Sequence, residues 1–245
     1  MQKLLIYKFR FNRLQWFVYF GSLIPLIILV WDGLNNNLTF NPIQEITQRT
    51  GRLAIIWLLF SLSCTPVNII FGLKPFLQIR RPLGLYAAFF ATLHFLTFVI
   101  LDYGLNLNLI LQTLIEKPFI FLGSFGFLIL ILLTVTSTKN SMKKPGKKWN
   151  LIHRLVYLAS IIPFIHFLLA IKYINLLAIT ITIILIALLI IRIPFIRKFF
   201  IKRQPSWSGL INDFLTGRKT KIINIQTKKY NFQFSRIVIR IVPGR

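Results

Sequence analysis

Six long apolar segments constrain the fold of this chain more than any other feature. We place them at roughly the following residues: 15–31, 52–71, 83–101, 119–138, 151–171 and 175–193. Each is long enough, or nearly so, for a helix to cross the hydrocarbon core of a bilayer, which is about 30 Å thick. Hydrophobic residues make up 56% of the chain and its mean hydropathy is +0.69, more apolar surface than a soluble domain of this size requires. We therefore expect an all-α membrane protein, built as a bundle of six transmembrane helices.

The charges between these segments predict which side of the membrane each connection faces. The chain carries 30 Lys and Arg residues against 5 Asp and Glu residues. The basic residues concentrate before the first segment, in the connections at 72–82 and 139–150, and after the last segment, whereas the other connections hold most of the acids. Basic loops stay in the cytoplasm, so both termini are expected there. The positive charge fits an anionic membrane surface better than nucleic acid, which would need a soluble basic domain.

The chain is expected to divide into three parts. These are a basic cytoplasmic N-terminus at 1–14, the helix bundle at 15–193, and a basic cytoplasmic tail at 194–245. Alternating apolar and polar residues toward the end of the tail are a weak signal for a small β-hairpin, and the alternative is a basic tail that lies on the inner leaflet. The sequence shows no internal repeat, and the single cysteine, Cys64, excludes an intramolecular disulfide.

All three histidines of the chain fall within apolar segments. With a rise of about 1.5 Å per residue, His94 lies roughly 10 Å and His166 roughly 8 Å inside the same expected outer end. Two imidazoles at one level suit the axial ligation of one heme iron from two helices. A stripe of small residues before His94, formed by Gly84, Ala87 and Ala91, would give a flat macrocycle room to approach the helix.

The third histidine, His153, lies near the inner end of the fifth segment, about 20 Å from the level of His166. Three interpretations stay open for it: heme ligation with a partner other than histidine, contact with a quinone or flavin, or contact with lipid headgroups. For any single histidine, the alternative is a hydrogen bond that holds two helices together. No Asp or Glu lies in the middle of a segment, where proton-coupled carriers usually place one.

A group of basic residues near the expected inner face is a candidate anion site. It would bind heme propionates or a flavin phosphate, or it reflects only the usual excess of positive charge on the cytoplasmic side. The group consists of Arg80, Arg81, Lys147, Lys148 and Arg154.

Short motifs around the histidines resemble a known family. They are TGR at 50–52, TP at 65–66, RRPLGL at 80–85, ATLH at 91–94, KPF at 117–119, TST at 136–138, GKKWNLIHRLVYL at 146–158 and PFIH at 163–166. In this order, they are similar to the heme-binding membrane subunits of the periplasmic protein-methionine-sulfoxide reductase system (MsrQ, also called YedZ), within the ferric-reductase-like transmembrane group. The resemblance covers roughly residues 45–170, and the tail beyond about 200 does not match clearly.

The resemblance implies that His94, His153 and His166 are the heme ligands. It implies heme b as cofactor, with FMN also associated, and a location in the bacterial inner membrane. Electrons would come from quinol or a cytoplasmic flavoprotein. They would leave to a periplasmic, molybdopterin-containing methionine-sulfoxide reductase subunit.

A separate electron donor is expected, because the stretch after residue 193 is too short for flavin and nicotinamide domains and has no Gly-rich dinucleotide fingerprint. Other functions stay open. One is a self-standing transmembrane ferric or quinone reductase. Others are a small transporter that relays protons through histidines, and a membrane assembly factor without a redox role.

Overall fold

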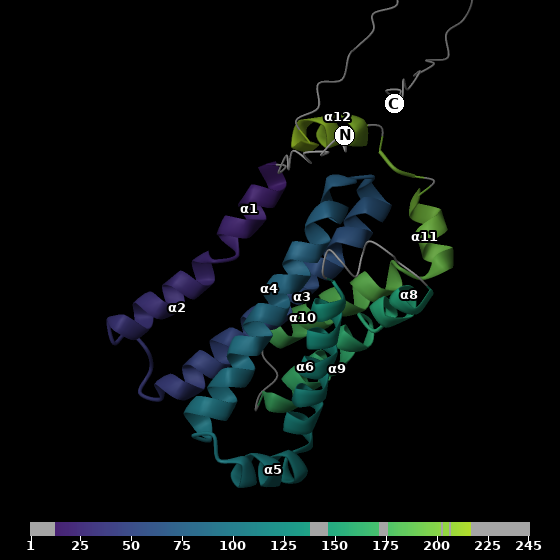
Figure 1. Cartoon of the computed structure of the whole chain (residues 1–245). Coiled ribbons are helices and arrows are strands. Elements are labelled where there is room, and N and C mark those ends of the chain that lie inside the picture. The colour runs from purple at the N-terminus through teal and green to yellow at the C-terminus, as the bar shows by residue number, and fades with distance from the viewer. Residues whose placement is uncertain (1–12, 138–146, 172–175, 202, 206, 217–245) are drawn as a thin grey trace, which may run out of the picture.

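The computed structural model describes residues 13–137, 147–171, 176–201, 203–205 and 207–216. Every regular element in these residues is helical, and they contain no strand. Figure 1 shows two long helices, α3 (Pro42–Phe71) and α4 (Pro75–Leu96), side by side along their length. A second antiparallel pair, α6 (Pro118–Thr136) and α9 (Leu158–Ala170), lies next to them.

Five helical stretches are long and apolar enough to cross a membrane. They are Leu14–Leu34, Pro42–Phe71, Pro75–Asp102, Pro118–Thr136 and Leu151–Ala170. A sixth exists only if α10 (Leu176–Ile190) is counted together with α11 (Pro194–Ile201), which is bent from it by 82°. The expectation of an all-helical membrane protein with about six spans is confirmed to this extent, and the orientation of the termini stays a prediction.

The first candidate span consists of two helices, α1 (Arg13–Gly21) and α2 (Ile24–Leu34). Together they lie along the outside of the bundle and lead into α3 at its lower end in Figure 1. The break between them precedes Pro25, which lies in the first turn of α2, where a missing N–H costs nothing.

Helix α3 begins ten residues before the apolar segment from which it was predicted. Asn41 caps it, because its side chain accepts a hydrogen bond from the backbone N–H of Gln44 at 3.2 Å, and Pro42 occupies the first helical position. The helix ends at Gly72, whose φ of 70° suits a left-handed C-cap. Hydropathy therefore located the apolar part of α3, while the capping residues set its true length.

Helix α4 continues directly into a six-residue π-helix, η1 (Thr97–Asp102). The hydroxyl of Thr97 donates to the carbonyl oxygen of His94 at 2.7 Å. A π-helical turn of this kind often marks a functional site, because it changes the direction of the side chains around it. After η1, the short helix α5 (Leu107–Glu116) closes this end of the bundle (Figure 1).

The fifth apolar segment does not form one continuous helix. It is divided into α8 (Lys147–Arg154) and α9, with a tight turn between them. In this turn the N–H groups of Leu155 and Tyr157 bond to carbonyls three residues earlier, in place of the four that an α-helix needs. The break places His153 on α8 and His166 on α9, so the two histidines of this segment belong to different helices.

The start of the tail is helical where the structure describes it. Helix α11 follows a sharp bend at Pro194, and α12 (Ser208–Thr216) lies over the end of the α3–α4 pair (Figure 1). Asn212 of α12 accepts from the backbone N–H of Lys74 and donates to the carbonyl oxygen of Gly72. The predicted β-hairpin falls on residues 220–245, outside the described residues.

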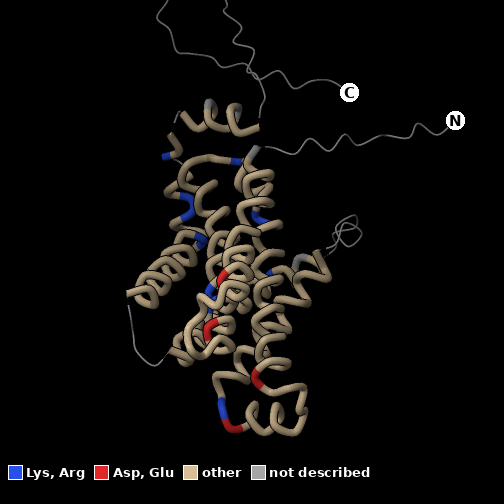
Figure 2. Tube along the Cα trace, turned by 90° about the vertical axis from the view of Figure 1, so that its left-hand side faces the viewer, with Lys and Arg blue, Asp and Glu red and all other residues tan. Residues whose placement is uncertain are grey.

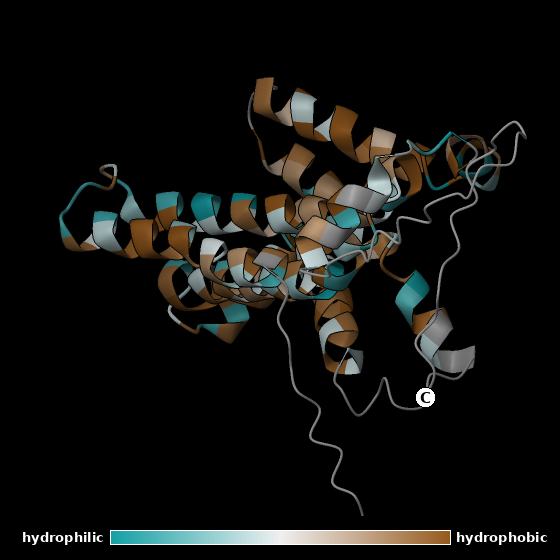
Figure 3. Ribbon diagram, turned by 90° about the horizontal axis from the view of Figure 1, so that it is seen from above, coloured by the Kyte–Doolittle hydropathy of each residue, from teal (hydrophilic) through white to brown (hydrophobic). Residues whose placement is uncertain are grey.

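The two helix pairs share an apolar core. It includes Leu58 and Leu62 of α3, Ala87 of α4, Ile129 of α6 and Ala159 of α9. The outward faces of the helices are also largely apolar (Figure 3), with many exposed Leu, Ile and Phe side chains. An apolar exterior of this extent suits a bundle surrounded by lipid.

Charged residues separate toward the two ends of the bundle. Figure 2 shows Lys and Arg gathered toward the end covered by α12, and Asp and Glu toward the end formed by α5. On the acidic side, Arg49 of α3 forms ion pairs with Asp32 of α2 and Glu45 of α3. The topology was predicted from these same charges, so the position of the α5 end outside stays a prediction.

Candidate functional site

The rings of His94 and His166 face each other across the bundle, with their centroids 6.1 Å apart and their planes at 64°. His94 comes from the end of α4 and His166 from α9, so one histidine is supplied by each helix pair. With metal–imidazole bonds of about 2 Å on both sides, a metal between two rings places their centroids roughly 6 Å apart. The observed spacing therefore fits the donor set of a bis-imidazole metal site.

Each ring is fixed by one hydrogen bond to a backbone carbonyl of the neighbouring helix. Nδ1 of His94 lies 2.8 Å from the carbonyl oxygen of Thr47 on α3. Nδ1 of His166 lies 2.6 Å from the carbonyl oxygen of Phe119 on α6. A carbonyl oxygen only accepts, so Nδ1 carries the proton in both rings and Nε2 keeps its lone pair. Both histidines thus have the tautomer that a metal ligand needs.

Aromatic side chains surround the pair. The ring of Phe119 stacks against His166 with centroids 6.0 Å apart. Phe95, next to His94, stacks on Phe127 of α6 with centroids 4.7 Å apart and connects the two helix pairs. These rings make the surroundings of the two histidines largely apolar.

A small apolar pocket begins at Pro163, one helical turn before His166. Its only polar lining residue is Ser160, and the lining comes from α3, α9 and α10: Ile55, Leu58, Leu59, Leu62, Ser160, Pro163, Phe164 and Leu185. An apolar lining suits a flat macrocycle, but the pocket has room for little more than a water molecule, far less than typical ligand pockets of about 300–1,000 Å³. The donor set of the two histidines fits a heme, and the ring of a heme requires the side chains around the site to move apart.

The stripe of small residues on α4 serves a different contact from the one expected. A Cβ placed on Gly84 would lie 3.3 Å from the hydroxyl of Ser61 on α3. Ala87 is completely buried in the core shared by the helix pairs. Gly84 lets α3 and α4 approach closely, so it does not provide room for a macrocycle there.

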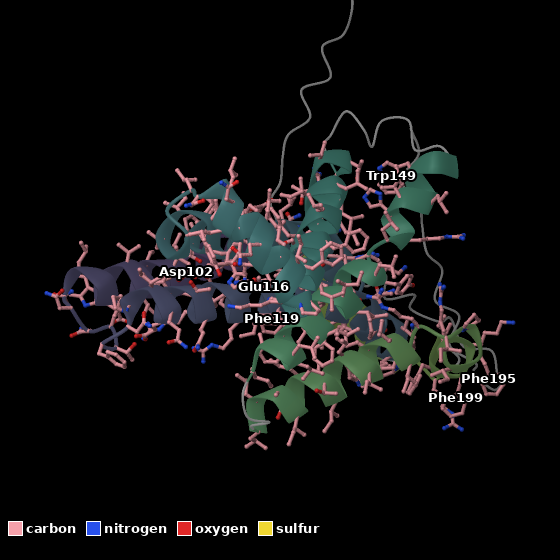
Figure 4. The ribbon with its side chains drawn as sticks, turned by 90° about the horizontal axis from the view of Figure 1, so that it is seen from below. Asp102, Glu116, Phe119, Trp149, Phe195 and Phe199 are labelled. Atoms are coloured by element: carbon pink, nitrogen blue, oxygen red, sulfur yellow. The ribbon has the colours of Figure 1, made fainter. Side chains whose placement is uncertain are left out.

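His153 is apart from the pair. Its ring stacks on Trp149 of α8 with centroids 3.8 Å apart, and Nδ1 lies 3.2 Å from the carbonyl oxygen of Trp149. Nε2 lies 3.4 Å from the hydroxyl of Ser137, at the end of α6. Figure 4 shows Trp149 well separated from Phe119, whose carbonyl holds His166. His153 therefore has its own surroundings, and its role as a ligand stays a prediction.

The predicted basic group is spread over two helices. Arg80 and Arg81 are partly buried on α4, and Nε of Arg81 is buried without a hydrogen-bond partner among the described residues. Arg154 is exposed at the end of α8. No hydrogen bond connects Arg154 to Arg80 or Arg81 within the part of the chain that the structure describes.

Sequence reasoning missed Arg192 as a partly buried cation of this region. Its Nη2 donates to the carbonyl oxygen of Leu62 at 2.6 Å, and its guanidinium lies over the ring of Tyr157 at 5.7 Å. Pro66 lies four residues after Leu62 and has no N–H to bond this carbonyl. A proline inside a predicted span was the available signal, because it leaves the carbonyl four residues earlier without its helical donor, and that carbonyl then needs another one.

Comparisons with known proteins identify the family. Residues 50–164 match the family described as ferric reductase like transmembrane component, a range that includes His94 and His153 and ends two residues before His166. A protein of Deinococcus radiodurans, named protein-methionine-sulfoxide reductase heme-binding subunit MsrQ, is 40% identical over 151 residues, which are 61% of this chain and 74% of the relative. The chain belongs to the MsrQ family.

Other MsrQ proteins show the same extent of similarity. The MsrQ of Brucella anthropi is 34% identical over 64% of this chain and 71% of its own length. The MsrQ of Bordetella parapertussis is 35% identical over 64% of this chain and 76% of its own length. Membership in the MsrQ family confirms the resemblance drawn from the short motifs, and with the apolar helices it makes the chain a multi-pass membrane protein.

Proposed function

We propose that this chain is the heme-binding membrane subunit of a protein-methionine-sulfoxide reductase system. In this role it takes electrons from quinol or a cytoplasmic flavoprotein and passes them to a periplasmic, molybdopterin-containing reductase subunit. The single observation that carries the proposal is the facing pair of His94 and His166, with ring centroids 6.1 Å apart. The names of the relatives, which describe heme-binding subunits, support it.

His94 and His166 would hold heme b through their Nε2 atoms. Heme b supplies reversible one-electron transfer when it is bound. The carbonyl oxygens of Thr47 and Phe119 keep the protons on Nδ1 and fix the direction of both rings. The surrounding Phe side chains give the site apolar walls, which would limit the reorganisation that accompanies a change of charge.

The position of the pair suggests where electrons leave. Both histidines lie toward the α5 end of their helices, where the acidic residues gather (Figure 2). With that end outside, the site is close to a periplasmic partner, and the chain belongs in the bacterial inner membrane. Electrons would enter at the opposite end, where Arg80, Arg81 and Arg154 offer cationic groups to heme propionates or to the phosphate of FMN.

His153 is proposed as a further ligand at the entry side. Its imidazole lies near the inner end of the bundle, between Trp149 and Ser137. A second heme at this position would need a non-histidine ligand, because the other two histidines of the chain form the outer pair.

The proposal is tested by heme content. A pyridine-hemochrome assay on purified protein of known concentration should report heme b, and the reduced protein should show a low-spin spectrum. His94→Ala and His166→Ala should each remove the same spectral component. His153→Ala should leave that component intact and remove only a second one. If either His94→Ala or His166→Ala left both content and spectrum unchanged, the ligand assignment would be wrong.

A further inference from the structure

The two histidines are held by the same local arrangement, which occurs twice in the structure. In each case, an imidazole on the second helix of a pair donates from Nδ1 to a carbonyl on the first helix. The donor and the acceptor are 47 residues apart in the chain in both cases. The helix pairs α3–α4 and α6–α9 therefore present equivalent supports to the two sides of the site, although the sequence shows no repeat.

A glycine follows each acceptor by one helical turn. Gly51 lies four residues after Thr47, and Gly123 lies four residues after Phe119, so each shares a helix face with its acceptor. A Cβ on Gly51 would lie 3.0 Å from Nδ1 and 3.1 Å from Cε1 of His94. A Cβ on Gly123 would lie 2.7 Å from Nδ1 and 2.8 Å from Cε1 of His166. Each imidazole ring thus lies directly against a glycine.

The glycine is the only residue that the two supports share. The five residues from acceptor to glycine read TQRTG at 47–51 and FIFLG at 119–123. The acceptor is a backbone carbonyl, which every residue type supplies, so the four other positions are free to differ. The glycine is not, because a side chain there would press against the imidazole ring.

We propose that Gly51 and Gly123 are positioning residues for the histidine pair. Each lets an imidazole approach the neighbouring helix closely enough for its Nδ1–H to reach the carbonyl one turn earlier. That hydrogen bond sets the tautomer and the plane of the ring, and it increases the basicity of Nε2 toward a metal. The inference rests on the proposed function only for the metal, since the ring contacts and the tautomers exist without it.

The distances predict that a side chain is tolerated less well at Gly123 than at Gly51. A contact of 2.7 Å forces the His166 ring to move, because real Cβ atoms essentially never approach a neighbour that closely. A contact of 3.0 Å at His94 requires a shift of only a few tenths of an ångström. Gly123→Ala should therefore break the hydrogen bond of its histidine, and Gly51→Ala should distort the bond while keeping it.

Gly126 provides a matched control on α6. A Cβ at this position would lie 2.8 Å from Cγ of Pro163 on α9. Gly126→Ala therefore forces the α6–α9 pair to adjust as severely as Gly123→Ala does, but it touches no imidazole ring. A purely structural role for Gly123 predicts that the two substitutions have the same effects.

The test uses the full-length protein in lipid nanodiscs, with ¹⁵N-labelled histidine. The chain has three histidines, so each signal is assigned by one His→Ala variant. In heme-free wild-type protein, we expect His94 and His166 to carry the proton on Nδ1. Gly123→Ala should remove this tautomer signal for His166, Gly51→Ala should shift the signal for His94, and Gly126→Ala should leave both in place.

A second measurement addresses the metal. In heme-loaded protein, we expect Gly123→Ala to lower heme affinity by about 10–100-fold, the range for loss of a group that orients a metal ligand. We expect Gly51→Ala to retain heme with a shifted low-spin electron paramagnetic resonance signal. An unchanged His166 tautomer in Gly123→Ala, or equal losses in Gly126→Ala and Gly123→Ala, would overturn the inference. A wild-type protein that binds no heme but shows both tautomers would overturn the proposed function and leave the positioning role supported.

Discussion

Arg192 donates a hydrogen bond from Nη2 to the carbonyl oxygen of Leu62, 130 residues earlier in the chain, at 2.6 Å. The carbonyl lacks its usual helical donor because Pro66 stands at the position that would supply it. The guanidinium therefore joins the end of α10 to the middle of α3. In an apolar bundle, an unpaired carbonyl is costly, so the contact connects a local defect of one helix to the packing of another.

Removal of this donor should destabilise the bundle. Arg192→Met keeps most of the side-chain volume and leaves the Leu62 carbonyl unpaired, which should cost about 1–3 kcal/mol. Thermal unfolding in detergent or nanodiscs measures the loss. Pro66→Ala restores an N–H four residues after Leu62, so the double variant Arg192→Met with Pro66→Ala should lose less than Arg192→Met alone. If the changes in unfolding free energy of the two single variants simply add up in the double variant, Arg192 and Pro66 do not act through the Leu62 carbonyl.

The cavity left by a missing imidazole should accept a free ligand. His166→Gly removes the ring between Gly123 and Phe119, and imidazole added to the solution should occupy the vacated space. On the proposed function, low-spin heme absorption should disappear in the variant and return with imidazole. His166→Leu gives a control in which the space is filled by a side chain that cannot ligate iron. Recovery of the spectrum in that control to the same extent would contradict the prediction.

Asn212 should contribute to the attachment of the α12 helix to the end of the α3–α4 pair. Asn212 makes hydrogen bonds of 3.0 Å to the N–H of Lys74 and 2.9 Å to the carbonyl of Gly72. Asn212→Ala removes both, so limited proteolysis should cleave the segment after α11 faster while the spectrum of the histidine site stays unchanged. Gln112→Ala, on α5 at the other end of the bundle, serves as control and should show the wild-type rate. The prediction is wrong if the two variants are cleaved alike.

The ion pairs at the acidic end should contribute modestly and depend on salt. Arg49 interacts with both Asp32 and Glu45, and its side chain is 31% exposed. Each exposed pair is expected to contribute about 0.2–1 kcal/mol at low ionic strength. Asp32→Asn should therefore lower the unfolding temperature slightly, and the difference from wild type should shrink as salt rises to about 1 M. A difference that is independent of salt would point to a packing effect instead.

The sequence was sufficient to predict apolar helices of about the right number and to bring His94 and His166 to one level, because helical rise converts residue counts into depth. The interruption between α8 and α9 was not predictable, since an apolar run looks the same whether or not a tight turn divides it. The hydrogen bonds that hold the two rings could not be predicted either. Their acceptors are backbone carbonyls, which every residue type has, so only Gly51 and Gly123 indicate them in the sequence, and a single glycine is a weak signal.

The stripe of Gly84, Ala87 and Ala91 shows the opposite error. Small residues at helical spacing were correctly recognised as a close approach, but the sequence does not say which partner approaches. At Gly84 the structure gives that place to Ser61 of α3. Spacing along one helix fixes a face, and the neighbour of that face is decided by how the helices pair.

Because each imidazole is secured inside its own helix pair, the gap between the two rings is determined where the pairs meet, at contacts such as Phe95 on Phe127. The distance between the two rings therefore depends on how the α3–α4 and α6–α9 pairs are positioned relative to each other. A small displacement of one pair along the other would change the distance between the imidazoles without breaking a hydrogen bond inside either pair.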